Sequence, residues 1–219
     1  MKKHILIAGL LTFLSSLYVL KATAQNVIFS EDFSGYQTGA SPGSIKTNAA
    51  AIIAHPTGQE GKWLMVKDKA TYKLNKNVPL PAKFTLEFDV LAVAEQIKDI
   101  APVCFGFAKD NAAREHISNG GAFVQLHYRD ADAINIGNYE FENKEANTTF
   151  DLSATANRPL HVKLVVNGQQ MAVYLDGDKL ADTVLFPAKA AKYFYFSGPW
   201  EFDSGAKLYI SNIKLSAGT

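Results

Sequence analysis

The chain has 219 residues, with 22 Lys and Arg against 21 Asp and Glu, a formal net charge of +1, and 47% hydrophobic residues. This balance gives no electrostatic reason to bind nucleic acid or an anionic membrane, so neither is expected as a partner. The single cysteine excludes an internal disulfide, and stability therefore has to come from a packed core.

The first 24 residues have the pattern of a cleavable secretory signal peptide. Lys2 and Lys3 supply a positive start, and the run from Ile5 to Leu20 carries no charge. Ala22 to Ala24 fits the small-x-small rule for signal peptidase, with Gln25 as the new N-terminus. The alternative is a transmembrane helix, but the run of 16 residues is shorter than the ~20 that a span needs.

Removal of this segment predicts one exported domain over residues 25–219. No further apolar run follows, so no transmembrane segment is expected after cleavage. The expected location is the periplasm, the outer-membrane surface or the medium. The mature chain would have a net charge of −2, because the first 24 residues hold three of the basic residues and no acidic one.

Alternation of apolar and polar residues predicts an all-β fold. In the stretch Phe84–Val90, four apolar residues alternate with Thr85, Glu87 and Asp89. The pairs Asn167-Gly168 and Asp176-Gly177 separate further alternating runs, which is the strongest short-range hairpin signal. The expected strands are Val27–Phe33, Ala50–Ala54, Lys62–Val66, Thr71–Leu74, Phe84–Val93, Val103–Ala108, Ala122–Arg129, Ile134–Tyr139, His161–Asn167, Gln170–Asp176, Lys179–Leu185, Tyr193–Ser197 and Lys207–Leu215.

Many short strands separated by Gly, Pro and Asn turns predict an antiparallel two-sheet sandwich. We expect its first and last strands to pair, with a bulge near Ser211-Asn212 where the apolar phase of the last strand shifts. Gly35–Asn48 is interpreted as a surface loop, and Asp110–Ser118 as a short helical turn. Cys104, in an apolar strand, is interpreted as a buried hydrophobic residue.

Several of these segments resemble the concanavalin A-like lectin and glucanase superfamily, which includes laminin-G-like domains. Tyr174 to Gly177 reads Tyr-x-Asp-Gly after a strand-turn-strand unit, as is common in such domains. Asp32-Phe33 followed by Gly39 to Pro42 is similar to the start of exported bacterial members. Gly61–Leu74, Phe84–Ala92 and Lys207–Gly218 are similar to exported domains of Bacteroidetes.

This resemblance implies a laminin-G-like jelly roll over nearly all of the mature chain. In the Bacteroidetes proteins the sandwich commonly precedes a peptidoglycan-binding domain of the outer-membrane-protein-A type. The matching motifs are structural and none is catalytic. The sequence departs from the two-domain pattern by stopping after the sandwich, so cell-wall tethering is not expected to carry over.

Four residues are predicted to contact a ligand. Gln125, His127 and Arg129 share the polar side of one strand, where they can line a sugar-binding groove on a concave face. Trp200 lies in a loop punctuated by Gly and Pro, where an exposed ring can stack on a pyranose. The alternatives are an ordinary solvated strand face and a tryptophan that closes the end of the sandwich.

Enzymatic readings are incomplete, so no catalytic residue is assigned. Gln125-Leu126-His127 resembles the Gln-x-His element of jelly-roll alginate lyases, but the accompanying Arg-rich and Tyr-Lys strands are missing. Glu87-Phe88-Asp89 begins the acidic strand of retaining glycosidases, but Leu91 and Ala92 stand where the second Glu belongs.

Metal binding has one weak candidate. Asp176 and Asp178 could offer oxygen ligands to Ca²⁺, although an Asp-Gly turn explains the same residues. The sequence therefore predicts an exported non-catalytic β-sandwich that binds a glycan or an envelope protein, without an obligatory cofactor. A carbohydrate-active enzyme and a structural domain of the cell envelope remain as alternatives.

Overall fold

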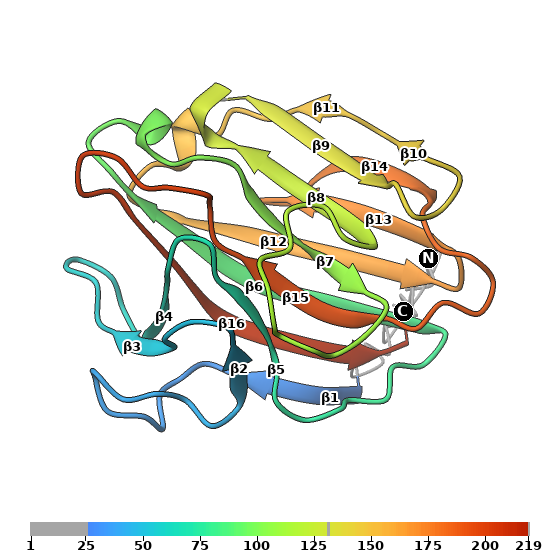
Figure 1. The fold of residues 1–219 in the computed structure, drawn as a ribbon, viewed down its shortest axis with the longest axis horizontal. Helices are drawn as coiled ribbons and strands as arrows, with labels where there is room; N and C mark the ends of the chain where they lie inside the picture. The colour runs from blue at the N-terminus through green and yellow to red at the C-terminus, as the bar shows by residue number, and fades with distance from the viewer. Residues whose placement is uncertain (1–25, 131, 219) are drawn as a thin grey trace, which may run out of the picture.

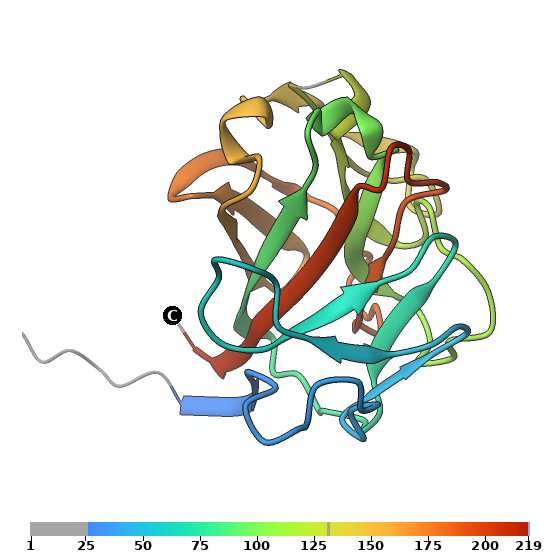
Figure 2. The ribbon, with the colours of Figure 1, turned by 90° about the vertical axis from the view of Figure 1, so that its left-hand side faces the viewer.

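The computed structural model describes residues 26–130 and 132–218. They form two antiparallel sheets that face each other, with β6 and β16 running side by side in one of them (Figures 1 and 2). The predicted signal peptide, residues 1–24, lies outside the described residues. Within the described part of the chain, no helix has the length and hydrophobicity to cross a bilayer.

The β6 sheet has eight strands, and β6 lies in the middle between β12 and β16. Across the sheet, the strands are β14 (Asp178–Val184), β13 (Gln170–Leu175), β12 (Pro159–Asn167), β6 (Lys83–Val93), β16 (Lys207–Ala217), β4 (Trp63–Val66) and β3 (Ile52–Ala54), with β1 (Asn26–Glu31) pairing with β16.

The β7 sheet also has eight strands, with β15 between β7 and β5 (Figure 1). Its order is β10 (Lys144–Glu145), β9 (Ala133–Asn138), β8 (Ala122–His127), β7 (Val103–Ala108), β15 (Tyr193–Ser197), β5 (Thr71–Leu74) and β2 (Ile45–Thr47), with β11 (Thr148–Thr149) pairing with β9. Three 3₁₀ turns, η1 (Ile97–Asp99), η2 (Tyr128–Asp130) and η3 (Ser153–Thr155), lie in the connections.

The predicted all-β, two-sheet sandwich is confirmed, and each of the thirteen expected strands is present with ends shifted by at most two residues. β1 pairs with β16 as expected, and the register of β16 shifts between Ser211 and Lys214, where Asn212 has a φ of +53°. The short strands β2, β10 and β11 were not expected, and β2 falls within the segment interpreted as a loop.

Two local predictions are wrong. Asp110–Ser118 forms no helical turn, because the Asp110 carbonyl and the Ile117 N–H bond to side chains of β5, which is distant in sequence. β8 ends at His127 and not at Arg129, because the chain turns into η2.

The two hairpin turns differ in type. Leu175 pairs with Asp178, so Asp176 and Gly177 are the central residues of the second turn, and both have positive φ, at +48° and +93°. This is the two-residue turn that Asp-Gly favours. In the first turn Asn167 pairs with Gln170, so the central pair is Gly168-Gln169, one residue later than predicted.

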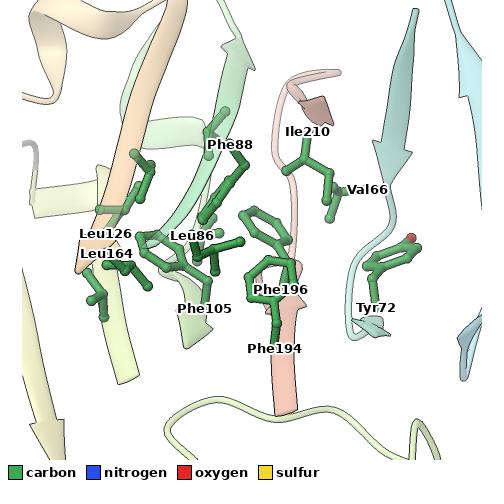
Figure 3. Close-up of a cluster of buried hydrophobic side chains, with 14 of the residues drawn as sticks. Val66, Tyr72, Leu86, Phe88, Phe105, Leu126, Leu164, Phe194, Phe196 and Ile210 are labelled. Atoms are coloured by element: carbon green, nitrogen blue, oxygen red, sulfur yellow. The ribbon is translucent and has the colours of Figure 1, made fainter. Parts of the chain in front are cut away.

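Aromatic side chains from both sheets fill the space between them (Figure 3). The fully buried ring of Phe88, from β6, meets Phe105 at 5.1 Å, Phe194 at 5.4 Å and Phe196 at 6.0 Å between centroids. The contacts with Phe105 and Phe196 are edge-to-face, which suits the ring quadrupoles. The centre of the core therefore joins the middle strands of the two sheets.

Replacement of Phe88 by Ala should strongly destabilise the fold. The loss of a buried ring that touches three others leaves a cavity in the core, and we expect the free energy of unfolding to fall by about 3–5 kcal/mol. Urea unfolding followed by tryptophan fluorescence measures this. Val184→Ala, on a side chain that is 37% exposed, should stay within about 0.5 kcal/mol of the wild type. Equal losses in the two variants would contradict the assignment of the core.

Candidate functional site

The loop that joins β7 to β8, residues 109–121, lies across the outer face of the β7 sheet (Figure 1). Outward-facing side chains of β7, β8 and β15 are buried beneath it, although they do not belong to the core between the sheets. Cys104, Phe123 and Tyr195 are each at most 2% exposed, and Ile117 of the loop packs against them. The loop therefore gives this face a second, small apolar cluster.

Hydrogen bonds fix the loop to the sheet. The Ile117 N–H donates to Thr71 Oγ1 at 2.9 Å, and Thr71 Oγ1 lies 2.7 Å from Ser197 Oγ. The Lys73 ammonium donates to the Asp110 carbonyl at 2.7 Å and lies 3.5 Å from the Asp110 carboxylate. Polar groups of the sheet thus hold the loop backbone at several points.

Burial sets the ionisation of two groups under the loop. It raises the pKa of Cys104 to about 12, although a hydrogen bond with Tyr195, at 3.2 Å between Sγ and Oη, opposes this. The Lys73 side chain is 1% exposed, and its burial lowers its pKa while the Asp110 carboxylate opposes the change. Cys104 is therefore an inert buried thiol, as predicted from its apolar strand.

Gln125 and His127 lie side by side on β8, but neighbouring groups already engage them. The Gln125 amide donates to the Ser118 carbonyl of the loop at 2.5 Å. His127 Nε2 lies 3.4 Å from Gln125 Oε1, and its Nδ1 lies 3.4 Å from Asp130 Oδ2. The His127 side chain is only 19% exposed, so these two residues do not form an open polar face.

Arg129 lies in η2 and links this end of β8 to the segment after Trp200. Its guanidinium makes ion pairs of 2.9 Å with Glu201 and 2.9 Å with Asp203. The hydrogen bond that Arg129 donates to the Glu201 carboxylate raises the pKa of Arg129. Arg129 therefore braces the loop that presents Trp200.

Trp200 is the most exposed of the predicted ligand residues, with 60% of its surface accessible. The Lys69 ammonium lies 4.5 Å from the centre of the ring, and the His116 ring lies 6.0 Å away at an interplanar angle of 63°. His116 Nε2 in turn lies 2.9 Å from the Gly198 carbonyl oxygen. The tryptophan is held in place from the side while a large part of its apolar surface remains open.

A glycine sets the path of the chain just before Trp200. A Cβ at Gly198 would stand 2.0 Å from the Lys67 carbonyl oxygen, so any side chain at this position would clash with the backbone of the β4–β5 turn. The Lys69 N–H donates to the Pro199 carbonyl at 2.9 Å in the same region. The close approach brings Lys69 and Trp200 together.

The structure thus gathers the four predicted ligand residues at one end of the outer face of the β7 sheet. Sequence reasoning missed Lys69 and His116, which hold the Trp200 ring, and Lys73, which anchors the loop. The available sequence signal for Lys73 was its place inside the predicted strand Thr71–Leu74, since a lysine that is buried in a strand needs a partner.

The weak metal candidates have other roles. The Asp176 carboxylate forms an ion pair with Arg158 at 2.7 Å and accepts a hydrogen bond from the His161 N–H at 2.8 Å. Asp178 begins β14 directly after the turn. Among residues 26–130 and 132–218, no group of three or more His, Cys, Asp or Glu side chains is arranged to hold a metal ion.

The acidic pair of β6 lies on the other outer face, that of the β6 sheet. Asp89 Oδ1 lies 2.8 Å from His161 Nδ1, and its Oδ2 accepts a hydrogen bond of 2.6 Å from Asn212. Glu87 lies 3.8 Å from both His161 and Lys214. Both carboxylates therefore belong to a cross-strand network of polar and ionic contacts.

Comparison with known proteins finds the same fold in solved structures only. No family model matches the chain, and no curated protein matches it in sequence. The carbohydrate recognition domain of Emp47p is similar in structure, with a TM-score of 0.65, 12% identity, and coverage of 89% of this chain and 98% of that domain.

Two other solved structures are also similar. The exoplasmic/lumenal domain of VIP36 has a TM-score of 0.62 at 12% identity and covers 87% of this chain and 92% of its own. The carbohydrate-binding module CBM66 from Bacillus subtilis has a TM-score of 0.53 at 16% identity, with 80% and 96% covered. At these identities the likeness shows the fold alone, and it agrees with the predicted antiparallel two-sheet jelly roll.

Cys104 offers a test of the covering loop. In the native protein at pH 8, iodoacetamide should leave Cys104 almost unlabelled, because the thiol is buried and its pKa of about 12 keeps it protonated. In guanidinium chloride, where the thiol titrates near its ordinary value of ~8.5, labelling should be complete. Mass spectrometry measures the modified fraction.

Ile117→Ala should speed labelling of the native protein, because Ile117 packs over the thiol cluster. Val184→Ala, on the exposed part of β14, serves as the control and should change nothing. Native and unfolded protein that react at the same rate would show that the loop does not protect this face.

Proposed function

We propose that the chain is an exported, non-catalytic glycan-binding module in which a sugar ring stacks on Trp200. The observation that supports this most directly is the exposure of the Trp200 ring, at 60%, on a loop braced by Lys69, His116 and Arg129. Aromatic platforms of this kind pair an apolar ring with the apolar face of a pyranose.

The neighbouring groups suit the polar part of such a ligand. His116 Nδ1 is not used in the contact with Gly198, and the Lys69 ammonium supplies donors next to the ring. Gln125 and His127 act in this proposal by holding the loop and the end of β8, since their polar atoms are engaged with Ser118 and Asp130. The ligand contacts are therefore assigned to Trp200, Lys69 and His116.

The fold supports the same assignment by analogy. Emp47p contributes a carbohydrate recognition domain and Bacillus subtilis a carbohydrate-binding module with this architecture. A shared fold does not fix a function, so the proposal depends on the Trp200 surface of this chain. Export would bring this surface to glycans of the envelope or the medium.

Binding to a panel of plant, algal and host polysaccharides tests the proposal, with Trp200→Ala as the main variant. Loss of the stacking surface should weaken binding of the best glycan about tenfold or more, which corresponds to about 1.4 kcal/mol. Tyr139→Ala is the matched control, because Tyr139 is an aromatic residue that is 40% exposed and lies directly after the last residue of β9. It should bind as the wild type does.

Three results would contradict the proposal. Equal binding by wild type and Trp200→Ala would remove the stacking site, and absence of binding across the panel would favour the structural role in the envelope. Release of reducing sugar or unsaturated product, lost in His127→Ala, would favour the enzyme. Thermal unfolding of each variant shows that the fold is intact.

A further inference from the structure

A pocket that is unrelated to the Trp200 surface lies at the opposite end of β15. Lys192, which lines it, directly precedes β15, whereas Trp200 follows the strand. Residues 78–82, which lead into β6, form one wall, and Ala188 with residues 190–193, which lead into β15, form the other, with Gly168 beside them. Its volume is about 380 Å³, within the usual range for small-molecule sites.

The walls of this pocket are apolar and stiff. Val78, Leu80 and Tyr193 are half-buried on its surface, and Pro79 and Pro81 fix the backbone of one wall. A smaller recess that shares Val78, Leu80, Lys192 and Tyr193 adjoins it and reaches core residues Phe194 and Leu215. The surface that an apolar group would contact is therefore preformed, so its binding would cost the protein little conformational entropy.

Lys192 is the one charged side chain that lines the 380 Å³ pocket. Its ammonium lies 4.6 Å from the centre of the Phe186 ring, and its nearest carbonyl, that of Ala190, is 3.4 Å away. Across residues 26–130 and 132–218, no carboxylate forms an ion pair with it, and burial lowers its pKa. A half-buried ammonium without a counter-ion is costly, and an anionic ligand would offset that cost.

The adjoining recess adds a charge of the same sign. The adjoining recess is lined by Lys76 and by no acidic residue. Neither pocket therefore contains a group that would repel an anion. Apart from Lys192 and Tyr193, the side chains that line the pocket are apolar and offer no polar partner to a free inorganic anion or a sugar.

We infer that this pocket binds a small free carboxylic acid with an apolar chain, whose carboxylate pairs with Lys192 and whose chain lies against Val78, Leu80 and Tyr193. This site is independent of the proposed glycan surface, because the two lie at opposite ends of β15. The single ammonium of Lys192 would pair with the single carboxylate of such a ligand, and the apolar side chains would contact its hydrocarbon chain.

Calorimetric titration of the purified chain with octanoate tests this, with octanol as the neutral analogue of the same length. Octanoate should bind to one saturable site at least tenfold more tightly than octanol. Lys192→Met keeps the length and apolar stem of the side chain, and should weaken octanoate at least tenfold while leaving octanol unchanged. Lys189→Met, on an exposed lysine of the same segment, should have no effect.

A second variant covers the case in which Lys192→Met unfolds. Leu80→Trp fills the pocket and should abolish binding of both ligands, while a melting curve reports whether the fold is kept. The inference is wrong if octanoate does not bind, if octanol binds as tightly, or if Lys189→Met loses as much affinity as Lys192→Met. Trp200→Ala should bind octanoate normally, which separates this result from the outcome of the glycan experiment.

Discussion

The packing of phenylalanine rings between the two sheets is the interaction on which the rest of the structure depends. Phe88 stands at its centre and contacts Phe105 from β7 and two rings from β15, so the middle strands of both sheets meet at one point. Each buried ring contributes about 1.5–3 kcal/mol through apolar area removed from water. Because the inner faces provide this stability without a disulfide, the outer faces are free to differ.

The two outer faces differ in the side chains that they carry. On the β6 sheet, Glu87, Asp89 and His161 form a cross-strand polar network that remains partly exposed to solvent. On the β7 sheet, Phe123 and Tyr195 form an apolar surface that cannot be left open to water, and the loop 109–121 covers it. The loop leaves Trp200, at the end of this face, with 60% of its surface exposed to solvent.

The strands could be predicted from the sequence because their signal is local. Alternation in Phe84–Val90 and the Asp176-Gly177 turn each depend on neighbours a few residues apart, and both were placed correctly. The course of loop 109–121 could not be predicted, because it depends on contacts with distant residues, such as Ile117 with Thr71 and His116 with Gly198. Its polar sequence was therefore assigned to a helical turn, although these long-range hydrogen bonds stabilise an irregular course.

The same distinction explains the outcome for the site residues. A strand pattern shows that Gln125 and His127 share a side of β8, but not that Ser118 and Asp130 occupy their polar atoms. Loop context indicated an exposed Trp200, and 60% of its surface is accessible. Gln125 and His127, whose polar atoms are already engaged, can only hold neighbouring segments in place, whereas the exposed ring of Trp200 can contact a ligand.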